Sequence, residues 1–282
     1  MAKQEGKKKS GCRVVLIVVL ILVLVIAAAI FIWYKAHEKE LKEMSMSAST
    51  ELVVGADASE FEVTTTDGQT VSMSGLLEGK NALGVVLFAT WCGPCEKEFP
   101  EMDRVYQKYQ DKMGMIGLDI DVLDDEKSAK EYAESHGLSF PIAYGKDLKT
   151  YKTSAYPTTL IIDRNGKIGF CRVGAIPDEE TFEKVVTAFL GDDYQETQLG
   201  YYTFYAFDKK KDIPGVEFSV TSESGTATYT TGKDGNADVF TDKPEELKVK
   251  VISVPDGYRI DDGGELTAGG ISTFFRLPVS KN

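Results

Sequence analysis

The sequence contains little histidine and little cysteine, with two histidines and four cysteines in 282 residues. A zinc site needs four ligands, and Cys or His residues at motif spacing usually supply them. Outside the closely spaced pair Cys92 and Cys95, the other such residues are scattered along the chain: Cys12, His37, His136 and Cys171. The sequence therefore predicts no zinc site, and we expect neither a metal nor a cofactor.

The chain also lacks a contiguous basic segment outside its N-terminus. Lys and Arg number 32 against 44 Asp and Glu, which gives a formal net charge of -12. Proteins that bind nucleic acid usually present clustered positive charge. The charge balance therefore argues against a nucleic acid partner, while the length is sufficient for two modest domains with accessory segments.

Charged residues are absent from residues 14–34, which are almost all apolar. A helix of about 20 apolar residues crosses the hydrocarbon core of a bilayer, so we predict a transmembrane anchor here. Lys and Arg are in excess on its N-terminal side. By the positive-inside rule, residues 1–13 form a cytoplasmic basic tail and the rest of the chain is exported. The predicted location is the cell membrane, with a single pass.

A cleaved signal peptide is the competing interpretation of this segment. It would have an apolar core of only 7 to 15 residues before a small-residue cleavage site. Here Ile30 to Tyr34 continue the apolar run past Ala27-Ala28-Ala29, which favours an uncleaved anchor. Cys12 precedes the run, so we do not expect a lipoprotein cysteine. The polar residues 35–54 are predicted to be a linker.

The stretch Trp91-Cys92-Gly93-Pro94-Cys95 follows the apolar run Leu83 to Leu87 and precedes apolar residues at helical spacing. This order predicts a strand, a tight turn and a helix. A thiol at a helix N-terminus faces unpaired N–H groups and the positive end of the helix dipole, which favour thiolate. We predict that Cys92 is the exposed, reactive thiol. Cys95, one turn further in, would attack a mixed disulfide formed at Cys92.

Two motifs resemble the thioredoxin superfamily and, within it, the membrane-anchored TlpA/ResA-like branch. The first is Ala89-Thr90-Trp91-Cys92-Gly93-Pro94-Cys95 followed by Glu98-Phe99-Pro100, and the second is Tyr156-Pro157-Thr158-Thr159 leading to Ile161-Ile162-Asp163-Arg164-Asn165-Gly166-Lys167. The resemblance covers residues 55–191 and implies an α/β thioredoxin-like fold. It also implies a substrate-binding site made by Trp91, Gly93, Pro94, Tyr156, Pro157 and Thr158.

The resemblance further implies that Pro157 is cis and packs against the two cysteines. The backbone of Tyr156 would then offer its N–H and C=O to an extended substrate segment, in a pairing that does not depend on the substrate's side chains. The alternative is an ordinary trans turn ahead of a strand. Cis peptide bonds are almost confined to proline, so a cis bond here would mark a site.

One position departs from thioredoxin itself, where a buried acid often lies six residues before the first cysteine. That position is Val86 in this chain, so proton transfer from Cys95 needs another base. Glu98 matches an acid of ResA-like proteins and is our candidate; the alternative is a solvated helix carboxylate. Cys171 is expected to be a buried, inert thiol.

The rest of residues 55–191 predicts a mixed sheet with helices. Asp67-Gly68 and Asn165-Gly166 indicate hairpins. We expect strands at Met113 to Ile120, Phe140 to Tyr144, Leu160 to Ile162 and Ile168 to Val173, and helices after Asp124-Asp125-Glu126, at Asp147 to Tyr151 and at Glu179 to Leu190.

Beyond a linker at residues 192–200, the composition favours strands, and residues 201–282 are predicted to form an all-β sandwich. The patterns Pro214-Gly215-Val216-Glu217-Phe218 and Thr231-Gly232-Lys233-Asp234-Gly235-Asn236-Ala237 resemble the Cna-B/SpaA (prealbumin-like) surface modules of Gram-positive bacteria. Such modules often carry a Lys–Asn crosslink. Ala206 stands where we would expect the lysine, so we predict no crosslink. The expected role is spacing, docking or partner recognition.

The leading hypothesis is an exported, membrane-tethered thiol-disulfide oxidoreductase that reduces protein disulfides through Cys92 and Cys95. Its expected partners are disulfide-containing exported proteins and, by resemblance to TlpA-like proteins, a CcdA-like membrane electron donor. Two alternatives remain open. One is a surface adhesion or scaffold protein with a non-catalytic thioredoxin-like domain, and the other is a thiol peroxidase.

Overall fold

The strand that carries the cysteine motif, β3 (Ala82–Phe88), is buried along all seven of its residues. A strand covered on both faces is typically a continuous apolar run, which is how this segment reads in the sequence. The computed structural model describes residues 52–145, 148, 151–191, 198–208, 211–269 and 274–282. The predicted transmembrane anchor, residues 14–34, lies outside these ranges. None of the helices within them is both long and apolar enough to cross a membrane.

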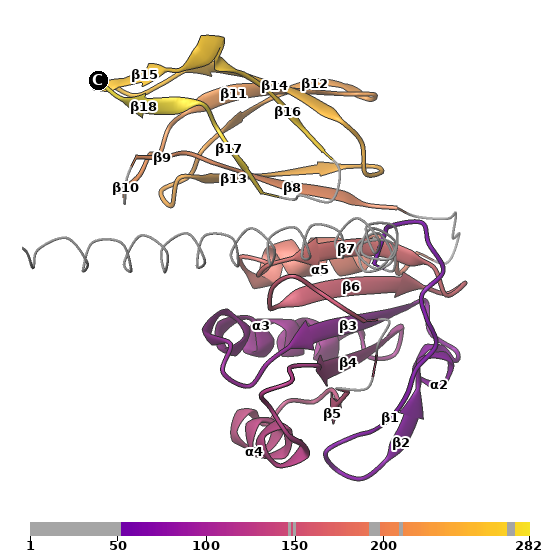
Figure 1. Ribbon diagram of the computed structural model, residues 1–282. Coiled ribbons are helices and arrows are strands. Elements are labelled where there is room, and N and C mark those ends of the chain that lie inside the picture. The colour runs from indigo at the N-terminus through magenta and orange to yellow at the C-terminus, as the bar shows by residue number, and fades with distance from the viewer. Residues whose placement is uncertain (1–51, 146–147, 149–150, 192–197, 209–210, 270–273) are drawn as a thin grey trace, which may run out of the picture. The chain divides into compact units, whose positions relative to one another are not determined.

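Five strands form a mixed sheet in the order β5-β4-β3-β6-β7 (Figure 1). On one side of β3, the strands β4 (Met113–Asp119) and β5 (Ile142–Tyr144) run parallel to it. On the other side, β6 (Thr158–Asp163) and β7 (Ile168–Val173) complete the sheet with antiparallel pairings. This sheet confirms the predicted α/β thioredoxin-like fold.

The longer helices described in this domain are α3 (Gly93–Tyr109), α4 (Glu126–His136) and α5 (Glu179–Thr187). The start of α4 was predicted from its acidic residues, and the Asp125 side chain does accept a hydrogen bond from the backbone N–H of Ser128. Gly137 ends α4 at φ 58°, a conformation that few residues other than glycine adopt easily. Local sequence signals therefore account for these helix boundaries.

Side chains on the two faces of β3 belong to two separate hydrophobic clusters, because successive side chains of a strand point to opposite faces. Val86 and Phe88 pack in the cluster that contains Phe99 of α3 and Phe182 of α5. Leu83, Val85 and Leu87 belong to the cluster on the other face, together with Phe61 and Met73. The active-site helix is thus held against one face of the sheet.

A small hairpin covers part of the second cluster. It comprises β1 (Glu62–Thr64) and β2 (Thr70–Ser72), as the Asp67-Gly68 turn predicted. A short helix, α2 (Met73–Leu77), follows the hairpin and was not predicted from the sequence. Ser72 caps α2 by accepting from the backbone N–H of Gly75. The helix expected at residues 147–151 lies mostly outside the described residues.

The C-terminal domain contains a four-stranded sheet, β12-β11-β14-β16, and a three-stranded sheet, β13-β8-β17, as the all-β prediction required. The strands of the first are β11 (Glu217–Ser222), β12 (Gly225–Thr230), β14 (Leu247–Ser253) and β16 (Glu265–Ala268). Those of the second are β8 (Gly200–Tyr205), β13 (Asn236–Thr241) and β17 (Phe274–Arg276). Smaller pairs are β9 (Phe207–Asp208) with β10 (Lys211–Asp212) and β15 (Tyr258–Ile260) with β18 (Val279–Lys281). Side chains from both larger sheets share one core.

Strand β8 contributes side chains to two cores. Tyr202 and Phe204 are buried in the core of the C-terminal domain. Tyr201, which points to the opposite face, is buried in the cluster of the thioredoxin-like domain, where its ring stacks 6.2 Å from that of Phe170. Residues Glu51–Asn282 accordingly form a single compact unit.

Candidate active site

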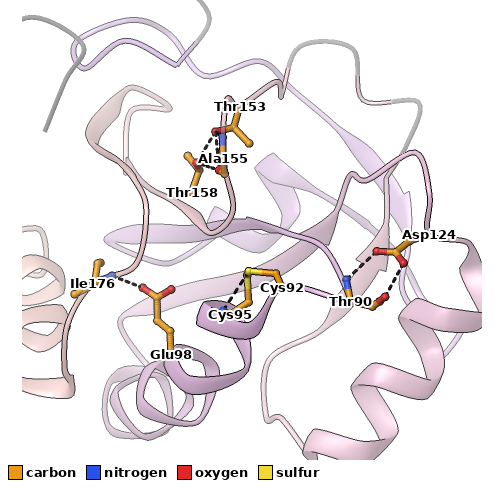
Figure 2. Close-up of a disulfide and its surroundings, with 9 residues drawn as sticks. All are labelled: Thr90, Cys92, Cys95, Glu98, Asp124, Thr153, Ala155, Thr158 and Ile176. Atoms are coloured by element: carbon orange, nitrogen blue, oxygen red, sulfur yellow. Dashed lines mark hydrogen bonds between the residues drawn. A yellow bond between two sulfur atoms is a disulfide. The ribbon is translucent and has the colours of Figure 1, made fainter. Parts of the chain in front are cut away.

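Cys92 is the residue that caps α3. Its Sγ accepts a hydrogen bond from the backbone N–H of Cys95, 3.2 Å away, and Gly93 and Pro94 occupy the first helical positions. Proline fits there because its missing N–H has no helical partner to lose. The two sulfur atoms are joined in a disulfide (Figure 2). The helix start predicted from the sequence therefore brings the two cysteines together.

The two cysteines differ in their access to solvent. Cys95 is fully buried, whereas Cys92 is 4% exposed, so the thiol predicted to be exposed is itself largely covered in the disulfide form. Cys92 also lines a cavity of about 390 Å³, together with Trp91, Gly93, Pro94, Tyr156 and Asp121, and Cys95 does not. An incoming group would reach the sulfur of Cys92 first.

The Tyr156-Pro157 peptide bond is cis, which confirms the prediction for this turn. The ring of Tyr156 contacts that of Trp91 edge to face, with 6.0 Å between centroids. Pro157 and Thr158 are buried and do not line the cavity. Thr158 instead donates from Oγ1 to the carbonyl oxygen of Ala155, 2.8 Å away, so its side chain stabilises the loop before the turn (Figure 2).

Glu98, the predicted base, lies on α3 one turn beyond Cys95 and is 4% exposed. Its Oε1 accepts a hydrogen bond from the backbone N–H of Ile176, 2.9 Å away, and its Oε2 has no hydrogen-bond partner among the described residues. Burial raises the pKa of Glu98 to about 8. The alternative of a solvated helix carboxylate is therefore wrong, because this side chain is removed from water.

A second buried carboxyl group, which the sequence patterns did not indicate, is that of Asp119 at the end of β4. It is fully buried beside Phe88, its partner in β3, and its Oδ2 has no hydrogen-bond partner among the described residues. Burial raises its pKa to about 8, and the negative charge of Asp124 contributes to the rise. The position at the carboxyl end of a strand beside β3 was the available signal.

Cys171, on β7, is the free cysteine of the described residues. Cys171 is partly exposed, and burial of its sulfur raises its pKa to about 12, as expected of an inert thiol. In the described part of the chain, no three His, Cys, Asp or Glu side chains are arranged to hold a metal ion. The arrangement at Cys92 and Cys95 can therefore supply a reversible dithiol/disulfide couple with buried carboxyl groups nearby.

Comparisons with known proteins point to the same chemistry. The model of the AhpC/TSA family matches residues 54–170. The thiol-disulfide oxidoreductase ResA of Bacillus thuringiensis (strain Al Hakam) is 38% identical over 138 residues, which cover 47% of this chain and 74% of that protein. The thioredoxin-like protein YneN of Bacillus subtilis (strain 168) is 31% identical over 134 residues, covering 46% and 78%.

Among solved structures, a putative thiol:disulfide interchange protein DsbE from Chlorobium tepidum is 28% identical to this chain. The match covers 50% of this chain and 99% of that one, with a TM-score of 0.45.

Proposed function

We propose that this chain, which belongs to the ResA family of thiol-disulfide oxidoreductases, reduces disulfides of other proteins by passing electrons from the Cys92/Cys95 dithiol. The observation that carries this proposal is the Cys92–Cys95 disulfide at the N-terminus of α3, where Cys92 alone of the pair lines the cavity.

The first step uses the reduced protein. The thiolate of Cys92 attacks one sulfur of a client disulfide, the other client sulfur leaves as a thiolate, and a mixed disulfide joins Cys92 to the client. The helix N-terminus stabilises the thiolate that begins this step. The cavity beside Cys92 leaves room for the client.

In the second step, the sulfur of Cys95 attacks that of Cys92 and the second client thiol leaves. Two electrons have then passed to the client, and the protein is left with the disulfide that the structure contains. Cys95 must lose its proton before it attacks. The buried carboxyl group of Glu98 has a pKa of about 8. A base with a pKa close to the working pH is well matched to take this proton.

Client binding would use backbone groups as well as side chains. Within the described residues, the backbone N–H and C=O of Tyr156 form no hydrogen bond with another residue, so they are free to pair with an extended client segment. Trp91 is 61% exposed beside Cys92 and offers an apolar surface. The contacts support Trp91, Gly93, Pro94 and Tyr156 as client-binding residues, with Pro157 and Thr158 supporting the turn.

The direction of electron flow, the location and the partners belong to the same proposal. The Gly-Pro dipeptide between the cysteines is that of thioredoxin, whose potential of about -270 mV is that of a reductant. An exported reductase needs electrons from the cytoplasm, which a CcdA-like membrane carrier would supply. Residues 14–34 would tether the protein to the cell membrane, with the N-terminus in the cytoplasm and disulfide-containing exported proteins as clients.

The C-terminal domain is proposed to be a Cna-B/SpaA-like module. Its two sheets around one core and its turns at Gly235 and Gly257, both at positive φ, support this assignment. It would provide spacing, docking or partner recognition outside the membrane.

An insulin-disulfide reduction assay with dithiothreitol tests the proposed activity. The unit Glu51–Asn282 should catalyse turnover, and the Cys92→Ala/Cys95→Ala double variant should not. A folded protein with no turnover would favour the adhesion or scaffold alternative. Thiol-dependent consumption of hydrogen peroxide in place of insulin reduction would favour the thiol peroxidase alternative.

A further inference from the structure

Arg172 on β7 is a buried cation that contacts the C-terminal domain. Its side chain is 2% exposed. The guanidinium carbon lies 4.0 Å from the ring centroid of Tyr201 and 4.4 Å from that of Phe274. Its Nη2 donates a hydrogen bond to Oγ1 of Thr203, 3.0 Å away. Because cations are attracted to aromatic faces, these contacts hold the guanidinium in one place.

One peptide group links Arg172 to Glu98. The Nε of Arg172 donates to the carbonyl oxygen of Ala175, 3.0 Å away, and the N–H of Ile176 in the same peptide unit donates to Oε1 of Glu98, 2.9 Å away. Figure 2 shows the second of these bonds, with Glu98 reaching from α3 toward Ile176. A peptide group is planar and stiff, so a movement of its carbonyl also moves its N–H.

We propose that Arg172 is a positioning residue through which the C-terminal domain orients Glu98 and favours its carboxylate form. The catalytic benefit rests on the proposed function, in which Glu98 accepts the proton of Cys95. The effect on Glu98 itself does not depend on that function. The module expected to be a spacer would thereby influence the redox site.

The surroundings of Glu98 shift its pKa in opposite directions. Burial raises its pKa most, and the N–H of Ile176 and then the positive charge of Arg172 lower it. Glu101, on the same helix, raises it. Arg172 is thus the cation that acts against burial, and its removal should shift the titration of Glu98 upward.

The groups that face Arg172 from the C-terminal domain keep it charged and in place. Burial lowers the pKa of Arg172, while Tyr201 and Asp238 favour its charged form. Asp238 also accepts a hydrogen bond from Oγ1 of Thr203, 2.6 Å away, which fixes the hydroxyl that Arg172 contacts. Loss of the Thr203 hydroxyl should therefore loosen Arg172 without removing its charge.

Two variants test the coupling, and a third is the matched control. Arg172→Gln removes the charge, and Thr203→Val removes only the hydroxyl while keeping a similar shape. Lys184→Gln is the control, because Lys184 on α5 lies 4.0 Å from the ring centroid of Phe240 in the C-terminal domain. It therefore removes one positive charge from a contact between the same two domains, with no described hydrogen bond to Glu98.

The measurement is an NMR titration of the Glu98 carboxyl carbon in each full-length protein labelled with ¹³C-glutamate, with Glu98→Gln to assign the signal. Arg172→Gln should raise the midpoint by about one pH unit relative to the unmodified protein. Thr203→Val should raise it by less, and Lys184→Gln should leave it unchanged. The pH dependence of insulin reduction should shift in parallel.

Equal midpoints for Arg172→Gln, Thr203→Val and Lys184→Gln would overturn the coupling. If Arg172→Gln does not fold, as circular dichroism would reveal, the comparison of Thr203→Val with Lys184→Gln decides alone. An unmodified protein that reduces no insulin would instead count against the proposed function, and the titration would still test the link between Arg172 and Glu98.

Discussion

The carboxylate of Asp124 accepts hydrogen bonds from both the backbone N–H and the hydroxyl of Thr90, at 2.8 and 2.6 Å (Figure 2). Thr90 lies in the turn between β3 and the cysteines, and Asp124 lies in the loop before α4. Two segments far apart along the chain are thereby joined next to Cys92. This contact fixes the turn that presents the reactive sulfur.

Replacing Asp124 should loosen that turn. Asp124→Ala leaves a partly buried N–H and a hydroxyl without their acceptor, so we expect a loss of about 1–3 kcal/mol in the free energy of unfolding. Urea unfolding of the oxidised protein measures it. Asp57→Ala is the control, because Asp57 forms an exposed ion pair with Lys167 and should contribute little. Equal losses for both variants would contradict the role given to Asp124.

The two cysteines should behave differently when each is removed. Cys95→Ala keeps Cys92, which lines the cavity, but cannot release the client, so mixed disulfides at Cys92 should accumulate. Cys92→Ala leaves Cys95 as the thiol of the pair, which is fully buried and should trap few clients. Non-reducing gels of cells carrying each variant, with Cys171→Ala added to both, would reveal the adducts. Similar trapping by both variants would rule out the difference in access.

The burial of Glu98 should make stability depend on pH. Its pKa in the folded protein is about 8, above its ordinary value of 4.5, so the folded state favours the protonated form. The stability that the folded protein gains by binding this proton is fully present below about pH 4.5 and is lost as pH rises through 8. The free energy of unfolding of Glu98→Gln, relative to that of the unmodified protein, should therefore rise with pH, by roughly 5 kcal/mol at most.

Chemical unfolding at several pH values between 4.5 and 9 measures this difference. Glu96→Gln, an exposed carboxyl on the same helix, should show no such trend. A difference between Glu98→Gln and the unmodified protein that stays constant with pH would mean that folding does not raise the pKa of Glu98. Asp119 has the same effect on both proteins and cancels in the comparison.

Two buried carboxyl groups could accept the proton of Cys95, and kinetics should separate them. Glu98→Gln should slow release of the client from the mixed disulfide by about 100-fold near neutral pH, the contribution typical of a general base. Asp119→Asn should change it much less, because Asp119 lies on β4 and not on the helix that carries Cys95. Stopped-flow fluorescence of a labelled peptide client follows this step. The reverse order of effects would assign the proton acceptor to Asp119.

Several features of this protein follow from local sequence alone. Cys92 caps its helix because the next residues, Gly93 and Pro94, suit the first helical turn, and the same four-residue stretch contains both cysteines. The strands, the Asp67-Gly68 hairpin and the end of α4 at Gly137 were likewise predicted, since each depends on a few consecutive residues. The cis peptide bond before Pro157 was predicted from a family resemblance and not from residue spacing.

Only the tertiary structure decided which charged groups surround the site. Glu98 and Ile176 are 78 residues apart in the sequence, and Arg172 and Thr203 are 31 apart, yet hydrogen bonds join each pair. Such contacts depend on how whole elements pack, and no local pattern encodes them. The burial of Glu98 also depends on tertiary packing. The pKa of a carboxyl group on an amphipathic helix depends on what covers its side chain. Here the loop after β7 covers Glu98, and its pKa is raised to about 8.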